Sequence, residues 1–246
     1  MKAMILAAGL GTRLRPLTDD RPKALVELNG RTLLEITLAR VRDIGIREVI
    51  VNVHHFADMV IDYLRAQNNF GMHVEISREQ ELLDTGGGLK KAAEFFIRDG
   101  QNSPFLVHNV DVLSSINLEE MVRRHEQRGV LATLAVQRRP SSRQLLFDSD
   151  DMLCGRRNGR DATPEIVREA AALEELAFCG IHVLSPKIFS HLDQADVFSI
   201  IPTYLRLASQ AEKVVGFRVD GCYWRDLGNP ASLQQAAEDL SRGDFS

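Results

Sequence analysis

Apolar residues in the first third of the chain follow two spacings in turn. Short apolar runs at residues 3–8, 48–53 and 73–77 predict buried strands. Between these runs, apolar residues recur every three or four positions over residues 34–44 and 56–64, which predicts two amphipathic helices. Strands that alternate with helices favour parallel pairing through right-handed crossovers. The pattern therefore predicts an α/β fold that begins with a parallel sheet.

The same two spacings continue through the rest of the chain. Further strands are predicted at residues 104–113, 130–136, 177–184 and 214–219, and further helices at residues 89–96, 118–125, 186–192, 200–208 and 231–240. An Asp-Gly pair at residues 220–221 predicts a hairpin turn, so Asp226 is expected on or just beyond a returning strand. The expected class is α/β, with a Rossmann-like, mixed, mostly parallel central sheet flanked by helices.

The segment that follows the first strand combines glycines with cations. Gly9 and Gly11 let the backbone approach a ligand closely and expose N–H groups, which suit phosphate oxygens. Arg13 offers a fixed fork of donors and Lys23 a mobile point charge, so together they can hold a polyphosphate. The spacing lacks the third glycine of a dinucleotide-binding loop and the Gly-Lys-Ser/Thr of a P-loop. We expect a phosphate-binding loop of another kind, the alternative being a plain turn after a strand.

Two further places carry residue types that serve chemistry. Gly86, Gly87 and Gly88 stand directly before the helix predicted from residue 89, where they would expose backbone amides. A flexible hinge is the alternative for these glycines. Asp111 lies near the end of an apolar strand, where a carboxylate is costly unless it is paired or binds a cation. Asp111 is therefore a candidate cation ligand, the alternative being a helix cap or a surface residue.

Composition limits the classes of partner. The chain of 246 residues has a formal net charge of −4, so no overall positive field would attract nucleic acid. Cys154, Cys179 and Cys222 lack the paired spacing of zinc or redox sites, and we expect reduced thiols in or near the core. No apolar stretch approaches the roughly 20 residues that span a bilayer, and no leader precedes the first strand. These features predict a cytoplasmic monomer or small homo-oligomer with no membrane or nucleic-acid partner.

Three segments together resemble the sugar-phosphate nucleotidyltransferases, also called nucleotide-sugar pyrophosphorylases. The string Ala-Ala-Gly-x-Gly-Thr-Arg-Leu-x-Pro-Leu-Thr at residues 7–18, with Arg-Pro-Lys-Ala-Leu-Val at residues 21–26, matches the family signature nearly position by position. An acidic-Thr-x-Gly segment stands at residues 84–87, and Trp-x-Asp-x-Gly-Asn-Pro at residues 224–230. The short chain looks most like the N-acetylmuramate-1-phosphate uridylyltransferase branch, with mannose-1-phosphate guanylyltransferases close behind.

The resemblance implies which residues bind the nucleotide. They come from the first loop and the glycine-rich segment: Leu6, Ala8, Gly9, Gly11, Thr12, Arg13, Gln80, Gly86 and Gly87. In the family, the backbone of the acidic-Thr-x-Gly segment lies against the nucleobase, a role that falls here to Gly86 and Gly87. Either Gln80 or Glu79 is expected to add a side-chain contact.

The resemblance also implies a metal site and an acceptor site. Asp111 and Asp226 match the two family aspartates that bind the catalytic metal, and carboxylates with phosphates favour Mg²⁺. The implied sugar-phosphate contacts are Lys23, Asn109, Glu175 and Gly180. The sequence departs from the family at Val110, where a glycine is usual. It also lacks the lysine of a Glu-Lys-Pro motif that helps to hold the sugar phosphate.

We expect an Mg²⁺-dependent enzyme that condenses a nucleoside triphosphate with a sugar 1-phosphate, giving a nucleotide sugar and pyrophosphate for cell-wall or surface-glycan precursors. Arg13, Lys23 and Asp111 would carry catalysis, because two polyanions must be brought together and the transition-state charge stabilised. The alternatives are a non-catalytic regulatory protein that binds nucleotide sugars, and nucleotidyl transfer to a non-sugar phosphate such as phosphocholine. An NAD-binding module, with its ribose-binding acid near Glu27 or Glu35, is a further rival.

The whole chain, residues 1–246, is expected to form one nucleotidyltransferase domain. Its nucleotide-binding half would cover about residues 1–113 and its sugar-phosphate-binding half about residues 114–246. The segment 138–164 differs in character, with arginines at 138, 139, 143, 156, 157 and 160 among Ser, Asp, Gly and Pro. Residues 145–147 and 152–153 fit short hairpin strands within it. For the arginines we expect a solvated, mobile excursion, the alternative being an oligomer contact or a grip on an anionic substrate. His125 is expected to be a surface or satisfied histidine rather than a catalyst.

Overall fold

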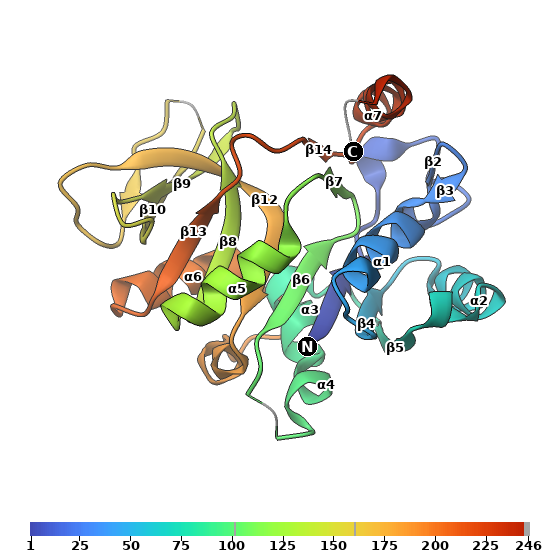
Figure 1. Cartoon of the computed structure of the whole chain (residues 1–246), viewed down its shortest axis with the longest axis horizontal. Helices are drawn as coiled ribbons and strands as arrows, with labels where there is room; N and C mark the ends of the chain where they lie inside the picture. Colours follow the sequence, from blue (N-terminus) through green and yellow to red (C-terminus); the bar gives the residue numbers. More distant parts are fainter. Residues whose placement is uncertain (101, 160, 244–246) are drawn as a thin grey trace. The chain divides into compact units, whose positions relative to one another are not determined.

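The computed structural model describes residues 1–100, 102–159 and 161–243, drawn in sequence colours in Figure 1. The residues group into two compact units, and each unit draws on separate stretches of the sequence. Unit 1 comprises Met1–Leu83, Val107–Ile116 and Cys222–Ser246, and unit 2 comprises Asp84–Leu106 and Asn117–Gly221. Because the chain leaves unit 1 and returns to it, neither unit is one continuous half of the sequence.

Unit 1 is built on a parallel sheet (Figure 1). Its strands are β1 (Lys2–Leu6), β4 (Glu48–Val53), β5 (His73–Arg78) and β6 (Phe105–Asn109). β4 pairs in parallel with β1 on one side and with β5 on the other. β6 flanks β1, and just beyond its end the N–H of Val110 donates to the carbonyl of Leu6 at 3.1 Å. The parallel sheet predicted for the first third of the chain is confirmed.

The helices of unit 1 begin and end where their capping residues stand. They are α1 (Leu33–Asp43), α2 (Ala57–Ala66) and α7 (Pro230–Arg242), with short 3₁₀ helices η1 (Thr12–Leu14), η2 (Lys23–Leu25) and η3 (Asn68–Gly71). The Thr32 hydroxyl accepts from the N–H of Glu35 at the start of α1. Asn229 accepts from the N–H of Ser232 at 2.9 Å at the start of α7, and Gly243 ends that helix with a left-handed φ of 79°.

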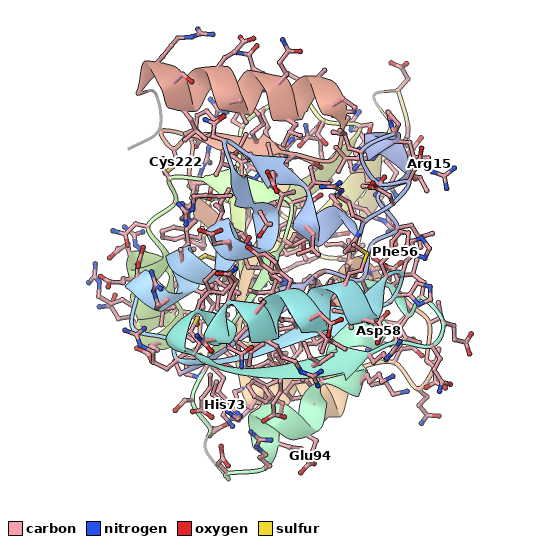
Figure 2. All side chains as sticks on the ribbon, turned by 90° about the vertical axis from the view of Figure 1, so that its right-hand side faces the viewer. Arg15, Phe56, Asp58, His73, Glu94 and Cys222 are labelled. Carbon is pink, nitrogen blue, oxygen red and sulfur yellow. The ribbon has the colours of Figure 1, made fainter. Side chains whose placement is uncertain are left out.

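α2 packs on the parallel sheet through one apolar face. Val60 and Leu64 on that face are buried, as the helical spacing predicts. Asp58, in the first turn of α2, lies beside the end of β5 (Figure 2). Its carboxylate accepts two hydrogen bonds from Arg78, at 2.8 and 3.0 Å. The ion pair joins the start of α2 to the last residue of β5.

Unit 2 carries a mixed sheet. Its strands are β8 (Ala132–Gln137), β9 (Arg143–Phe147), β10 (Leu153–Asn158), β11 (Glu165–Ile166), β12 (Glu174–Leu184) and β13 (Val214–Arg218). Its helices are α3 (Asp84–Lys91), α4 (Ala93–Ile97), α5 (Leu118–Arg128), the 3₁₀ helix η4 (Pro186–His191) and α6 (Ile200–Ser209). β12 lies between β8 and β9 in antiparallel pairing, whereas β13 pairs with β8 in parallel. The expected α/β class with a mixed sheet between helices is confirmed, and antiparallel pairing prevails in this unit.

The hairpin predicted at Asp220 and Gly221 is wrong. The next strand, β14 (Trp224–Asp226), pairs antiparallel with β7 (Val112–Ser114) of unit 1 and not with β13. A two-residue hairpin turn of the expected type needs positive φ at both central residues, and neither Asp220 nor Gly221 has it. The Asp220 carboxylate instead accepts from the backbone N–H of Arg138 at 2.6 Å. The chain still turns at Asp220 and Gly221, and Asp226 lies at the end of a strand, as expected.

The hairpin strands predicted within the arginine-rich segment are confirmed, since β9 pairs antiparallel with β10, with a register shift between Leu153 and Gly155. The expected mobile excursion of the arginines is not found. Their guanidinium groups pair with carboxylates of unit 2. Arg156 pairs with Glu165 at 2.7 Å, and Arg138 pairs with Glu174. Hydrogen bonds from Arg218 and then Arg138 lower the pKa of Glu174 to about 2. The expectation for Arg160 lies outside the described residues.

The cysteines form no disulfide in the described structure. Cys154 and Cys179 are buried and Cys222 is half-buried, and all three are free thiols. The expectation of unpaired thiols is confirmed. In the part of the chain that the structure describes, no helix combines the length and apolar character needed to span a membrane.

Candidate functional site

The loop after β1 has a conformation that requires a glycine at one position. Gly11 has a left-handed φ of 67°. A Cβ atom there would lie 2.9 Å from Cγ2 of Thr18 and 3.2 Å from Cβ of Lys23. The Thr18 hydroxyl donates to the Gly11 carbonyl at 2.9 Å and closes the loop. Gly9 has no neighbour within 4 Å of a Cβ position, so space around it is open.

Two cations of the loop, Lys23 and Arg13, each face one of the two predicted metal ligands. Lys23 begins η2, and its ammonium donates a hydrogen bond to the Asp111 carboxylate. These two side chains keep only 12% and 14% of their surface exposed. Arg13, in η1, lies with its Nη2 atom 3.8 Å from Oδ2 of Asp226. Each of the two aspartates therefore has a cation of the loop as its ion-pair partner.

Pairing of β7 with β14 brings the two aspartates to neighbouring segments. The register sets Asp226 opposite Val112, and the N–H of Leu227 donates to the carbonyl of Asp111 at 2.8 Å. Oδ1 of Asp226 accepts from the N–H of Gly228 at 2.6 Å. A Cβ at Gly228 would lie 2.5 Å from that oxygen and 2.6 Å from Nη2 of Arg13. A larger residue at position 228 would make the ends of the Asp226 and Arg13 side chains shift from these positions.

The donor set of this pair fits a hard divalent cation. No group of three or more His, Cys, Asp or Glu side chains gathers among the described residues in a way that would hold a metal alone. Mg²⁺ is usually bound by one or two carboxylates together with substrate phosphates and water. Asp111 and Asp226 supply those two carboxylates beside two cations that suit phosphates.

The triple glycine lies inside a helix and not before it, which corrects the sequence-based prediction. α3 begins at Asp84. The N–H groups of Gly86 and Gly87 donate to the carbonyl of Phe198, at 2.9 and 3.2 Å, and the hydroxyl of Thr85 accepts from the N–H of Ile200. These contacts outweigh the poor helix propensity of glycine. A Cβ on Gly86 would lie 2.3 Å from the Phe198 ring, so the glycine serves close packing.

Glu79 and Gln80 differ in their freedom to meet a ligand. Glu79 is 3% exposed. Its carboxylate accepts from Asn52 Nδ2 at 2.7 Å and from the N–H of Leu83 at 3.1 Å. Gln80 is exposed. Of the two residues named from the sequence, only Gln80 can contact a ligand without giving up these hydrogen bonds.

The predicted acceptor residues of unit 2 lie on β12. Glu175 is exposed, and its Oε1 atom lies 2.8 Å from Nη2 of Arg157. Gly180 has a left-handed φ of 74° and stands where the register of β12 against β8 shifts. The interior glycine that the sequence singled out is therefore also a requirement of this β-bulge.

The predicted site residues divide between the two units. Unit 1 holds Leu6, Ala8, Gly9, Gly11, Thr12, Arg13, Lys23, Gln80, Asn109, Asp111 and Asp226. Unit 2 holds Gly86, Gly87, Glu175 and Gly180. Sequence reasoning missed Asn52, whose side chain accepts from the N–H of Ala7 at 2.7 Å. The available signal was a polar residue inside the apolar run at residues 48–53.

Comparisons with known proteins concern the chain as a whole and indicate its family. Residues 2–147 match the family described as nucleotidyl transferase. The chain is 34% identical over 252 residues to the N-acetylmuramate alpha-1-phosphate uridylyltransferase of Caulobacter vibrioides, which covers 97% of this chain and 96% of the relative. It is 28% identical over 237 residues to the mannose-1-phosphate guanyltransferase of Yarrowia lipolytica, covering 94% of this chain. The chain spans 61% of the length of that second relative.

A solved structure shares the fold. UDP-glucose pyrophosphorylase in complex with UDP-glucose matches with a TM-score of 0.76 over 98% of both chains. The two sequences are 17% identical, so this likeness concerns the fold alone.

Proposed function

The chain belongs to the nucleotidyl transferase family, and from that premise we propose that it joins a uridylyl group to a sugar 1-phosphate with the aid of Mg²⁺. The observation that carries the proposal is the pairing of Arg13 with Asp226 and of Lys23 with Asp111. Two cations and two carboxylates then face the same substrate phosphates. The likeness to the Caulobacter uridylyltransferase, over nearly the full length of both chains, supports UTP as donor.

In the proposed reaction, an oxygen of the sugar 1-phosphate attacks the α-phosphorus of the triphosphate. A new P–O bond forms, the bond from the α-phosphorus to its bridging oxygen breaks, and pyrophosphate leaves with that electron pair. Because the attacking oxygen is already anionic, no general base is needed. The task left to the protein is to align two polyanions and to stabilise the charge that develops.

The residues of unit 1 divide this task. The backbone from Leu6 through Ala8, Gly9 and Gly11 to Thr12 would follow the nucleotide. The exposed Arg13 would neutralise the departing β- and γ-phosphates, and the less exposed Lys23 the α-phosphate and the acceptor. Asp111 and Asp226 would hold Mg²⁺, which supplies positive charge to the phosphate oxygens when bound.

The remaining predicted residues would contact the base and the acceptor. Gly86 and Gly87 would meet the nucleobase through their Cα atoms and carbonyls, since their N–H groups donate to Phe198. Gln80 would add a side-chain contact to the base. Asn109, Glu175 and Gly180 would contact the sugar phosphate.

The sugar proposed as first acceptor is N-acetylmuramate 1-phosphate, so the product would serve cell-wall or surface-glycan synthesis. We place this reaction in the cytoplasm, in keeping with the free thiols. Family membership removes the NAD-binding module from the alternatives. A regulatory protein without turnover and transfer to phosphocholine are kept as outcomes of the test below.

The experiment is a measurement of pyrophosphate release with Mg²⁺. Four nucleoside triphosphates are combined with a panel of sugar 1-phosphates and phosphocholine, and Asp111→Asn serves as the control variant. We expect turnover with UTP and one sugar 1-phosphate. In Asp111→Asn the rate should fall by about 10²–10³, the usual effect of removing a preorganised electrostatic group.

The other outcomes decide between the alternatives. Turnover with phosphocholine alone would overturn the sugar acceptor. Turnover with GTP alone would overturn UTP as donor. Binding of a triphosphate without pyrophosphate release across the panel would contradict the enzyme and favour the regulatory protein.

A further inference from the structure

A chain of buried side chains holds the C-terminal end of β1. The N–H of Ala7 donates to Oδ1 of Asn52 at 2.7 Å, and Nδ2 of Asn52 donates to Oε1 of Glu79 at 2.7 Å. Oε2 of Glu79 then accepts from the N–H of Leu83 at 3.1 Å. Asn52 and Glu79 are each 3% exposed. Side chains of β4 and of the segment after β5 thus reach the start of the loop.

The polarity of this chain is fixed. Both partners of Glu79 are N–H donors, so each carboxylate oxygen acts as an acceptor. Asn52 must therefore turn its amide nitrogen to Glu79 and its oxygen to Ala7. A carboxylate that accepts a hydrogen bond from a side-chain amide polarises that amide. The amide oxygen then becomes a stronger hydrogen-bond acceptor. Because a buried carboxylate without hydrogen-bond donors is costly, the Glu79 carboxylate stays where Asn52 and the N–H of Leu83 can donate to it.

These hydrogen bonds between side chains also set where the loop begins. The parallel register between β1 and β4 ends at Leu6 opposite Asn52. The next N–H, that of Ala7, leaves the backbone ladder and bonds the Asn52 side chain instead. Ala7 directly precedes the backbone that carries Ala8, Gly9 and Gly11. The direction in which the chain leaves the sheet is therefore set by a side chain of β4.

We propose that Asn52 and Glu79 are positioning residues for the triphosphate loop. They act through the peptide of Ala7 and touch neither substrate. This inference rests on the proposed function, because it takes residues 8–11 as the segment that meets the nucleotide. It adds to that function two residues that hold the loop in its binding conformation.

The first test replaces Glu79 by its amide. In Glu79→Gln, the side chains at positions 52 and 79 are both amides, and each offers an oxygen at one side and an NH₂ group at the other. Whichever way the two amides turn, one N–H donor faces another donor, at Leu83, Asn52 or Ala7. A buried bond lost in this way is worth about tenfold in affinity. We expect the dissociation constant of UTP with Mg²⁺, measured by calorimetry, to rise about tenfold. The KM of the sugar 1-phosphate should change less than twofold.

The matched control is Tyr63→Phe. It also removes half-buried side-chain hydrogen bonds of unit 1, one from Thr32 to the Tyr63 hydroxyl at 3.1 Å and one from that hydroxyl to Glu35 at 3.4 Å. UTP affinity should not change in this variant. Thermal unfolding of each protein, with binding measured well below the midpoint, separates loss of affinity from loss of fold.

The second test exchanges the two side-chain types. Asn52→Asp alone sets two carboxylates against each other and should weaken UTP binding. In the double variant Asn52→Asp with Glu79→Gln, the new carboxylate at position 52 would accept from the N–H of Ala7 and from the new amide at position 79. The oxygen of that amide would accept from the N–H of Leu83. Every bond of the chain is rebuilt with one negative charge, so UTP affinity should return to within about threefold of wild type.

The outcomes separate the two proposals. Unchanged UTP affinity in Glu79→Gln, or no recovery in the double variant when it is folded, would overturn the positioning role alone. A wild-type protein that binds none of the four triphosphates would overturn the proposed function and this inference with it.

Discussion

Two cations of one loop differ in their surroundings, and the difference suits two tasks. Lys23 keeps 12% of its side chain exposed and is held against Asp111. Arg13 keeps 66% exposed, near Asp226. A preorganised, partly desolvated charge acts strongly on a nearby phosphate, whereas an exposed guanidinium can follow a group that departs. Both proposed roles depend on the placement of single side chains.

Removal of either cation should impair turnover without unfolding the protein. Arg13→Ala and Lys23→Ala are each expected to lower the rate of pyrophosphate release by about 10²–10³. The control is Arg21→Ala on the same loop, where an exposed arginine pairs with Asp20, and its rate should be near wild type. A Lys23→Ala enzyme of ordinary activity would contradict the role given to Lys23.

His125 is the satisfied histidine that the sequence predicts, and it lies in the core. Its ring nitrogens bond the hydroxyls of Thr133 at 2.9 Å and Ser185 at 3.0 Å. Burial lowers the pKa of His125 to about 4. At pH values between this pKa and the ordinary pKa near 6.5, His125 carries a proton in the unfolded chain but not in the folded protein. The contribution to stability is therefore lost as pH falls through that range.

The consequence can be measured with urea at two pH values. From pH 7 to pH 5, His125 should lower the free energy of unfolding by about 2 kcal/mol. His125→Gln keeps a donor and an acceptor but does not titrate, so its loss over the same interval should be about 2 kcal/mol smaller than in wild type. Equal losses in the two proteins would show that His125 does not titrate as its burial requires. Burial also lowers the pKa of His108 to about 4. Both proteins contain His108, so its contribution cancels in the comparison.

At the scale of elements, α3 depends on a neighbour distant in sequence. Three glycines in succession are poor helix formers, yet α3 contains Gly86, Gly87 and Gly88. Phe198 caps two of their N–H groups with its carbonyl. Lys90, near the other end of α3, donates to the carbonyl of Gln194 at 2.7 Å. The segment before α6 thus stabilises a helix that its own sequence does not favour.

A methyl group at Gly86 should therefore destabilise the protein, although alanine favours helices. Its Cβ would meet the Phe198 ring at 2.3 Å and the Phe198 carbonyl at 2.9 Å. We expect Gly86→Ala to lower the free energy of unfolding by about 2 kcal/mol. The control is Gly221→Ala, where nothing lies within 4 Å of the new Cβ.

A double-mutant cycle identifies the cause. In a Phe198→Ala background, Gly86→Ala should cost less than in wild type, because the ring is gone and only the contact with the carbonyl at 2.9 Å is left. An undiminished cost in that background would place the strain elsewhere.

At the scale of the whole molecule, the predicted residues are shared between units that interleave in sequence. The triphosphate loop and both aspartates belong to unit 1, and the predicted base and sugar contacts at Gly86, Gly87, Glu175 and Gly180 to unit 2. Assignment of a nucleotide half and a sugar half at about residue 113 stays a prediction. Unit 1 by itself contains every group proposed to hold the metal and the phosphates of the nucleotide.

Metal removal should therefore stop turnover and leave the fold in place. With EDTA, pyrophosphate release is expected to fall below detection and to return on addition of Mg²⁺. Thermal unfolding without substrates should shift little, because Asp111 and Asp226 keep Lys23 and Arg13 as partners. A large loss of thermal stability in EDTA would instead indicate a structural metal.

The sequence by itself determined much of this protein. Apolar spacing placed the strands and helices of unit 1, because each element buries one face. The signature from Ala7 to Val26 indicated the family, since its glycines and cations serve one chemistry. The paired cysteine spacing of a disulfide or zinc site was absent, and the thiols are free.

Tertiary structure alone decided the rest. Pairing of β14 with β7 joined Asp226 to Asp111 and overrode the hairpin that Asp-Gly favours locally. Phe198 extended α3 over the glycines, and Asn52 fixed the point where β1 ends. Local patterns report which face of an element is apolar and which turn is easiest. They carry no information on partners that the fold brings from far along the chain, and these partners position the candidate site.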